Sequence, residues 1–572
     1  MLRESTSSTV VQARAEHFGL AMLFALFAAA WYATAWVCDD AFITLRTVDN
    51  ALHGYGLVWN VGDRVQTYTH PLWMLLVLVA SVPHGDSYYA TLALGALWTA
   101  VALVLLVWRV ARTPSSAALA LAALLGSRAF VDYASSGLEN PLVNALLAAE
   151  LIACARPARD ERSQFLRALL AVLLLLARLD LIFLTAPMLL AAWRRDGLPR
   201  PATLVLAVLP LVAWEAFSLV YYGALIANSA LAKLSAGLPT GDRLAQGVYY
   251  LWASVRWDPV SVLLLVAGPV AAVVARDPFG RAVVAAIGAH LAWVVWVGGD
   301  FMAGRFLTPA LLLAAALLAR SPLPRRVGWS LAVGLTAAVL ATPYLSPFAV
   351  RDYGEPWHAP IDARGVADER RFHLESTALR AVLAGGGWRS DAQREAARQT
   401  REYYYRDPWL KGLAAVAVLD EGDAWPPTDS EAAAAQTPVL VKGGVGLLGF
   451  RMGPELVIVD YHGLGDPLLS RLPALPRDPV LANLIPRLAD LDWRVGHYLR
   501  PVPAGYALSR ATGENRIRDR DLAELYDVIR SVVSGPLLSA ERFASIGRLH
   551  SSWASERIER YVARTPAYAG GD

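Results

Sequence analysis

The chain has 572 residues, of which 56% are hydrophobic and only 18% are charged. Soluble globular proteins have about 25% charged residues, so the composition favours an integral membrane protein over a soluble enzyme. The formal net charge of +3 does not indicate a nucleic-acid partner, and the two cysteines, Cys38 and Cys154, do not indicate a disulfide framework.

Long apolar segments fill roughly the first 350 residues. A membrane-spanning helix needs about 20 mostly apolar residues, and the first candidate, Phe18–Val37, is expected to be retained because it has no small-residue cleavage site. A polar loop then runs to His70. Ten further candidate helices follow, at 89–108, 117–130, 140–155, 166–177, 181–193, 202–221, 260–275, 281–297, 306–319 and 329–347. We therefore predict a polytopic α-helical membrane protein with about eleven transmembrane helices.

One apolar segment, Pro71–Val82, is too short to span a membrane comfortably and is expected to form a re-entrant or interfacial helix. If it does not cross and the N-terminus is cytoplasmic, the arginine-rich loops fall on the cytoplasmic side, as the positive-inside rule requires. Eleven crossings then place the C-terminus outside. Most of the polar islands between helices also fall on the outer side, which predicts a cavity that opens there.

The composition changes near Phe348, where charge, proline and glycine become frequent. We predict a transmembrane catalytic domain at 1–349 and an extracytoplasmic α/β domain at 350–572. Within this tail, 437–442 and 454–460 are expected to be strands, and 375–383 and 519–533 are expected to be helices.

Two adjacent carboxylates, Asp39 and Asp40, directly follow the first apolar segment. Carboxylates near a membrane are energetically costly unless they are paired with another group or have a function there. Such a pair can supply a general base and a partner that binds an acceptor hydroxyl or a divalent cation. The alternative is a helix end with solvated acids, but acids are unfavourable at a helix C-terminus.

The stretch that begins with this pair, DDAFITLRTVDNALHGYGLVWNVGDRVQTYTHPLW, closely resembles the first outer loop of GT-C integral membrane glycosyltransferases, specifically the AftB-like arabinofuranosyltransferase group. The segments SSGLENPL, NSALAKLSAGLPTGDRLAQGVYYL and VGGDFMAGRFLTP resemble later motifs of the same group. The resemblance covers nearly the whole chain. It departs at Thr69-His70, where the group has Ser-Asn, and this leaves the preference for sugar or acceptor open.

The resemblance implies a polyprenyl-phosphate-linked sugar donor and transfer to a cell-envelope glycan at the outer face of the bacterial cytoplasmic membrane. For an enzyme of this group the donor is decaprenylphosphoryl-arabinofuranose and the product is a terminal β-(1→2) arabinofuranose on arabinogalactan or lipoarabinomannan. A polyprenyl phosphate leaving group requires cations where negative charge develops. The candidates for binding the donor or acceptor are Arg46, His70, Glu139, Asn228, Lys233, Asp300 and Arg305.

Several of these candidates have structural alternatives. Arg305 could be an interfacial snorkelling residue, and His70 could simply cap the helix that starts at Pro71. A further outer-face cation, Arg178, could pair with Asp180 in a turn.

In the expected mechanism one of the two adjacent acids deprotonates the acceptor hydroxyl, which displaces the lipid phosphate and inverts the anomeric carbon. Asp39 is the preferred base and Asp40 its partner, although the sequence does not separate them. One alternative is a GT-C enzyme that moves another polyprenyl-linked sugar onto glycoprotein or lipid A. Another is a lipid-linked glycan transporter. This is disfavoured because transporters place ionisable residues near the midplane of the bilayer, often on broken helices in two repeated halves of the chain. In this sequence the acids and cations cluster at one membrane face, and no half-to-half repeat is found.

Overall fold

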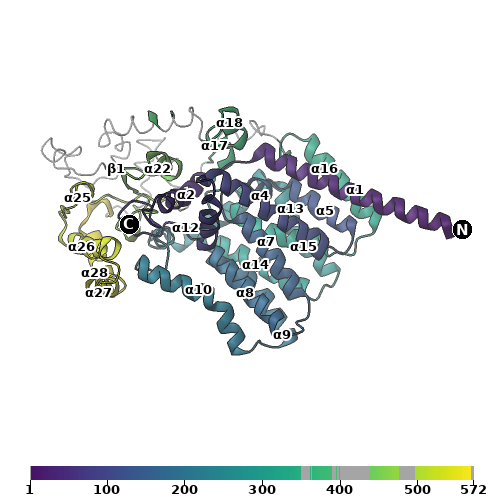
Figure 1. The fold of residues 1–572 in the computed structure, drawn as a ribbon, viewed down its shortest axis with the longest axis horizontal. Coiled ribbons are helices and arrows are strands. Elements are labelled where there is room, and N and C mark those ends of the chain that lie inside the picture. The colour runs from purple at the N-terminus through teal and green to yellow at the C-terminus, as the bar shows by residue number, and fades with distance from the viewer. Residues whose placement is uncertain are drawn as a thin grey trace.

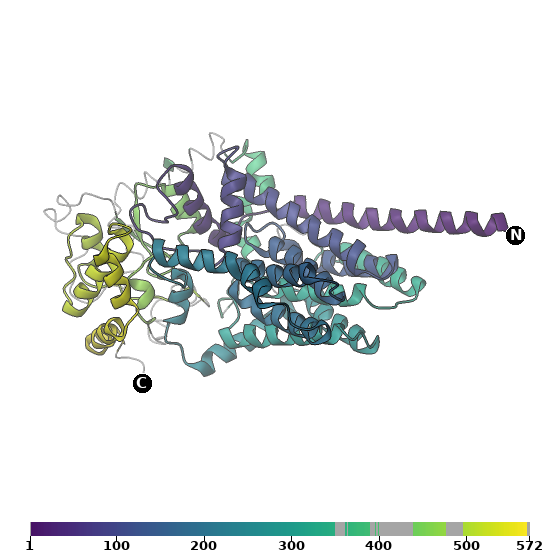
Figure 2. The ribbon, with the colours of Figure 1, turned by 60° about the horizontal axis from the view of Figure 1, so that its bottom comes forward.

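The computed structural model describes residues 2–348, 361–388 apart from 363, residues 395, 398 and 399, and the ranges 439–475 and 496–568. Helices dominate this part of the chain (Figure 1). Helix α1, at Leu2–Thr34, projects from one end of the molecule, and the C-terminal helices gather at the opposite end in both Figure 1 and Figure 2.

Residues 2–348 form the helical bundle that occupies the middle of both views. After α1 its α-helices are α2 (Asp39–Leu52), α3 (Pro71–Ser81), α4 (Ser87–Leu105), α5 (Pro114–Gly126), α6 (Arg128–Asp132), α7 (Asn140–Ala155), α8 (Glu161–Ala177), α9 (Ile182–Asp196), α10 (Pro201–Tyr221), α11 (Asn228–Leu234), α12 (Thr240–Trp257), α13 (Pro259–Val274), α14 (Gly280–Val297), α15 (Thr308–Ala319) and α16 (Arg325–Ala341). Three shorter turns connect them, the π-helical η1 (Leu106–Val110) and the 3-10 helices η2 (Leu179–Leu181) and η3 (Arg305–Leu307).

Every apolar segment singled out in the sequence falls on a helix, and α7 has the predicted bounds. Among the described residues, four helices are long and apolar enough to cross a membrane, at Gln12–Thr34, Ser87–Val110, Pro201–Tyr221 and Gly280–Val297. A fifth span is possible if α12 and α13, which are bent by 107°, together make one crossing. The chain is thus a polytopic helical membrane protein, and the count of eleven crossings stays a prediction.

Three of the shorter apolar helices, α5, α7 and α15, lie inside the bundle. All twelve residues of α15 are buried, and most residues of α5 and α7 are buried as well. A helix that is hydrophobic all round belongs in an interior. By contrast, only 11% of the apolar window in α10 is buried, as expected for a helix that faces lipid.

Two helices occupy stretches that the sequence analysis left as polar segments. Asp39 and Asp40 begin α2 instead of a loop, and acids in a first turn are favourable because they face the positive end of the helix dipole. Helix α12 lies in the second polar segment, at 222–258, with α11 before it. The short segment at 71–82 does form the expected short helix, α3.

The tail contains both expected strands, although shortened. Strands β1 (Val439–Val441) and β2 (Val457–Val459) pair in parallel, with Val439 opposite Val457, and α22 (Gly446–Met452) connects them. The other described elements of the tail are α17 (Glu369–Thr377), α18 (Leu379–Ala384), η5 (Leu469–Arg471), α25 (Tyr506–Thr512), α26 (Arg520–Ser534), α27 (Ala540–Leu549), α28 (Ser552–Arg564) and η6 (Pro566–Tyr568).

Of the two predicted tail helices, the one at 519–533 matches α26, whereas the one at 375–383 is divided between α17 and α18. The predicted domain boundary between 349 and 350 lies outside the described residues.

The tail packs directly on one end of the helical bundle. One core cluster joins Ile43 and Trp59 to Leu440, Met452 and Ile458 from the tail. Helices α2 and α22 lie against each other in this cluster. The tail therefore helps to fix the position of α2, which carries the acid pair.

Candidate active site

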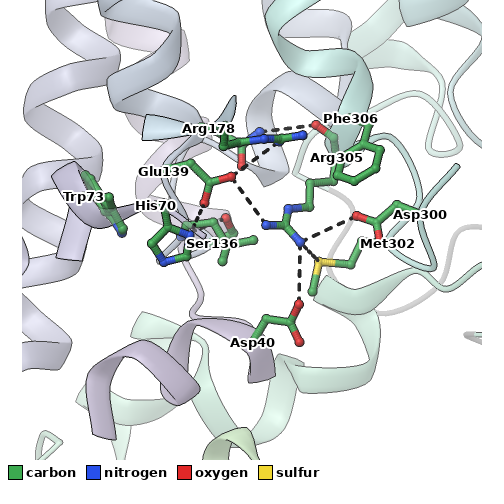
Figure 3. Close-up of polar contacts among 12 residues, drawn as sticks. Asp40, His70, Trp73, Ser136, Glu139, Arg178, Asp300, Met302, Arg305 and Phe306 are labelled. Atoms are coloured by element: carbon green, nitrogen blue, oxygen red, sulfur yellow. Dashed lines mark hydrogen bonds and ion pairs between the residues drawn. The ribbon is translucent and has the colours of Figure 1, made fainter. Parts of the chain in front are cut away.

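Arg305 lies at the centre of a buried ionic cluster (Figure 3). One guanidinium nitrogen is 3.6 Å from a carboxylate oxygen of Asp40 and 3.6 Å from one of Asp300. The other is 3.4 Å from Glu139. Only 9% of the Arg305 side chain is exposed. A buried cation needs such partners, and three carboxylates from three separate segments supply them.

A glycine-rich turn aims Arg305 into the cluster. Gly304, with φ of +77°, adopts the left-handed conformation, and an added Cβ there would lie 2.6 Å from Trp257 and from the Cβ of Ala129. Glycine alone tolerates both the conformation and the close approach. Arg305 then opens the turn η3 immediately before α15.

Glu139 is fully buried and anchors the positively charged groups. It lies 3.4 Å from Arg178 and 3.2 Å from His70, in addition to its contact with Arg305. Burial alone would raise the pKa of Glu139, but the positive groups around it hold the pKa well below its ordinary value. Glu139 is therefore a permanent anion that positions cations, and it is poorly suited to accept a proton.

Asp40 differs from Glu139 because 18% of its side chain is exposed and it lines a cavity. Burial raises the pKa of the Asp40 carboxyl to about 6, against the opposing effect of Arg305 and Lys233. A carboxylate with a pKa near the working pH can accept a proton and later release it. Asp40 therefore has the properties of a general base.

The cavity has a volume of about 260 Å³ and is lined by both charged and apolar residues. Its charged lining residues are Asp40, Arg178, Asp180, Glu215, Lys233 and Arg305. Apolar residues of α8, α10 and the loop before α11 form the other side, and two of them, Leu225 and Ile226, are exposed on the molecular surface. The cavity can thus hold a ligand with both a charged group and a hydrocarbon chain.

His70 and Thr44 also line the cavity, and the Thr44 hydroxyl lies 2.9 Å from Nε2 of His70. Asp40 and Thr44 are four residues apart on α2 and therefore share one face of the helix. His70 connects this face to Glu139.

Asp39 points away from this site. Its two carboxylate oxygens accept the backbone N–H groups of Gly446, at 3.0 Å, and Leu447, at 2.8 Å. These donors belong to the first turn of α22, whose free N–H groups and positive dipole favour an anion. The two adjacent acids therefore have different environments, one inside the cavity and one bound to the tail.

Arg46 and Asn228 lie outside the cavity lining and bind backbone carbonyls. Arg46 donates to the carbonyls of Trp59, Gly449 and Leu456 at 2.8 to 3.0 Å. The Asn228 amide donates to three carbonyls of the loop that follows β2, and its oxygen accepts the hydroxyl of Ser470. The structure therefore gives both residues a role in holding the tail, whereas we expected them to bind substrate.

The remaining sequence candidates lie in or beside the cavity. Lys233 lines it from α11 and has no ion pair within the described part of the chain. Asp300 is buried behind Arg305, and its other oxygen accepts the N–H of Phe301. Arg178 makes a bidentate ion pair with Asp180, as expected if it has a structural role in the turn. It also contacts Glu139 and lines the cavity.

Two lining residues, Trp214 and Glu215, were not identified from the sequence. The available signal was that Glu215 is the one charged residue in the apolar stretch of α10. In the described ranges no group of three or more His, Cys, Asp or Glu side chains is placed to hold a metal ion.

The chain is similar to two known glycosyltransferases over most of its length. It is 29% identical over 534 residues to a terminal beta-(1->2)-arabinofuranosyltransferase of Mycobacterium tuberculosis, covering 80% of this chain and 83% of that protein. It is 27% identical over 599 residues to the protein of the same name from Corynebacterium glutamicum, covering 90% and 83%. No protein-family model matches the chain.

Two solved structures also align with this chain. Crystal structures of ArnT from Cupriavidus metallidurans, bound to undecaprenyl phosphate and in the apo state, give TM-scores of 0.42 and 0.41, each at 13% identity. The alignments cover 87% of both chains for the bound form, and 89% of this chain and 88% of that chain for the apo form. The resemblance that the sequence motifs predicted is confirmed by the two sequence relatives: the chain is a homologue of terminal beta-(1->2)-arabinofuranosyltransferases over most of its length.

Proposed function

We propose that this protein transfers arabinofuranose from a decaprenyl-phosphate donor to a cell-envelope arabinan, forming a terminal β-(1→2) linkage. The observation that carries the proposal is the cavity in which Asp40 lies beside Arg305, with Arg178 and Lys233 on the same walls. A proton acceptor and several cations in one partly apolar cavity are the groups that transfer from a lipid phosphate needs. The two similar arabinofuranosyltransferases support the choice of sugar.

The phosphate of the donor would bind to the cations of the cavity. Lys233 is exposed on the cavity wall and is available for a phosphate oxygen. Arg305 and Arg178 are held from behind by Glu139, so their guanidinium groups are fixed before the donor arrives. Preorganised cations stabilise the charge that develops on a leaving phosphate without a reorganisation cost. The hydrocarbon chain would leave through the apolar side at Leu225 and Ile226.

Asp40 would act as the base, which reverses the preference for Asp39 drawn from the sequence. The acceptor hydroxyl gives its proton to the Asp40 carboxylate as its oxygen bonds to the anomeric carbon. The bond from that carbon to the phosphate oxygen breaks, and polyprenyl phosphate leaves with the electron pair. A single displacement inverts the configuration, so a β-linked product requires an α-configured donor. A β-configured donor that gave a β product would exclude single displacement.

We place the cavity and the tail on the outer side of the bacterial cytoplasmic membrane, in line with the distribution of arginines in the sequence. Helices α25 to α28 of the tail lie at the end of the molecule opposite the N-terminus (Figure 1). Helix α22 of the tail packs against α2, which contributes Asp40 to the cavity, and this supports one common side for the tail and the cavity. Accessibility of cysteines introduced singly into the tail of the full-length protein, probed with a membrane-impermeant reagent in intact cells, tests this placement.

Transfer itself is tested with the purified full-length protein, polyprenyl-phosphoryl-arabinofuranose and a synthetic arabinan acceptor. We expect an acceptor extended by one pentose, identified by mass spectrometry, and a β-(1→2) linkage in the NMR spectrum. The proposal is wrong if the wild-type protein transfers nothing, or if it moves lipid-linked glycan across vesicles without transferring sugar.

One observation favours a second candidate, a related enzyme that uses another polyprenyl-linked sugar. His70 stands where the resembling group has Asn, and its side chain lines the cavity. Parallel assays with polyprenyl-phosphoryl donors of mannose and aminoarabinose separate the two candidates, because only the preferred sugar should give the highest kcat/KM.

A further inference from the structure

Glu215 is an isolated carboxylate on a helix that faces lipid. It is the one charged residue among the 21 residues of α10, and it is half-buried. It lies six residues before the helix ends at Tyr221, which is about 9 Å along the axis. An ionisable side chain at such a position is costly unless it has a partner.

Within the described residues Glu215 has neither a hydrogen bond nor an ion pair. Its side chain lines the cavity that also contains Asp40, Arg305 and Lys233. A partner that offsets the cost of the carboxylate would therefore be a ligand that enters the cavity.

The charge of Glu215 limits which part of a ligand it can bind. A carboxylate repels phosphate, and it accepts hydrogen bonds from hydroxyl groups. A metal ion is a poor candidate, because no third acidic, histidine or cysteine side chain completes a metal-binding group in the described part of the chain. Hydroxyl groups of a sugar remain as the matching chemistry.

Trp214 supplies the second feature of a sugar site. It precedes Glu215 on α10, lines the same cavity and is packed 6.3 Å from the ring of Tyr68, which also lines it. The electron-rich face of an indole ring attracts the C–H groups of a sugar ring. An aromatic face with one well-placed polar group is a common arrangement in pockets for small ligands.

We propose that Trp214 and Glu215 form a subsite for the hydroxyl groups of the donor sugar, an inference that rests on the proposed function. The donor is the reactant that carries a hydrocarbon chain, and α10 stands next to the apolar side of the cavity, where Leu225 and Ile226 reach the surface. Phosphate and sugar would then bind to opposite charges, with the phosphate at the cations and the sugar hydroxyls at Glu215.

The experiment compares two ligands, polyprenyl phosphate and polyprenyl-phosphoryl-arabinofuranose, on the purified full-length protein. We expect Glu215→Gln to weaken binding of the sugar-bearing ligand by about tenfold, the effect of one lost hydrogen bond to a charged group. Binding of polyprenyl phosphate should stay within twofold of wild type. The KM for the donor should rise with the same factor, and the KM for the acceptor should not change.

Asp242→Asn, at an exposed acid on α12, is the matched control and should leave both affinities unchanged. Trp214→Leu should reproduce the selective loss of affinity for the sugar-bearing ligand. The inference is overturned if Glu215→Gln leaves both affinities unchanged, changes both equally, or raises the KM for the acceptor instead. A wild-type protein that neither binds nor transfers the arabinose donor would refute the proposed function, and the inference with it.

Discussion

Asp39 and Asp40 are neighbours in the chain, yet their carboxylates serve different parts of the molecule. Asp39 accepts two backbone N–H groups from the first turn of α22, whereas Asp40 lies 3.6 Å from the Arg305 guanidinium inside the cavity. Successive residues on a helix project about 100° apart, so one helix can present one acid to the tail and the next to the cavity.

Asp40→Asn should lower kcat by about 10²- to 10⁴-fold, the usual contribution of a general base. Asn keeps the size of the side chain but does not accept the acceptor proton. Binding of polyprenyl phosphate should be retained, because Arg178, Lys233 and Arg305 remain. Single-turnover transfer with saturating donor measures the chemical step, and a loss of less than tenfold would rule out Asp40 as the base.

Asp39→Ala should mainly destabilise the protein. Two partly buried N–H groups of α22 lose their acceptor, at a cost of up to about 1–3 kcal/mol for each group that is left unsatisfied. We expect a lower Tm in detergent and faster proteolysis of the tail, with kcat of the folded fraction within a few-fold of wild type. Asp39→Asn, which retains one acceptor, should fall in between.

Asp49→Asn, near the exposed end of the same helix, is the matched control for the Asp39 variants. It should change neither the Tm nor the rate of tail proteolysis. If Asp39→Ala lost activity as severely as Asp40→Asn while its Tm was unchanged, the assignment of the two acids would have to be exchanged.

The activity should depend on pH with an acidic limb near pH 6. The base must be deprotonated to work, and the pKa of Asp40 is raised to about 6, mainly by burial. The log of kcat/KM should therefore fall with a slope of about one below pH 6 and level off above pH 7. A profile that is flat from pH 5 to pH 8 would contradict the assignment.

Lys233→Met should have two separable effects. The KM for the donor should rise by about tenfold because a phosphate contact is lost. The acidic limb should also move to higher pH, because Lys233 lowers the pKa of Asp40 and its removal lets that pKa rise. Lys442→Met in the tail is the control. An unchanged pH profile would mean that Lys233 does not act on the base.

The helices could be predicted from the sequence wherever an apolar run was long. α7 was found with its bounds, and α10 and α14 were found within one residue at each end. Helix α2 was missed because it is amphipathic and polar at its start, and one of its faces packs against α22, about 400 residues later in the chain. Local periodicity cannot reveal a partner at that distance.

Several charged residues that converge in the structure could be picked out from the sequence, whereas their positions relative to one another could not. Arg305, Glu139, Asp300 and Asp40 do converge, and the glycine-rich turn before Arg305 was visible in the sequence. Arg46 was among the candidates for binding the donor or acceptor, yet its guanidinium binds three backbone carbonyls. A side chain that caps carbonyls cannot be told from one that binds ligand without knowing where the backbone runs.

The contact between α2 and α22 also sets an order of assembly. Asp39 is made early in synthesis, and its hydrogen-bond donors at Gly446 and Leu447 emerge about 400 residues later. During synthesis from the N-terminus, the bundle is inserted before the segment that fastens α2 exists. The side of the cavity that includes Asp40 is therefore complete only after residue 447 has been synthesised. A chain that stops earlier lacks the contacts that hold the start of α2 in place.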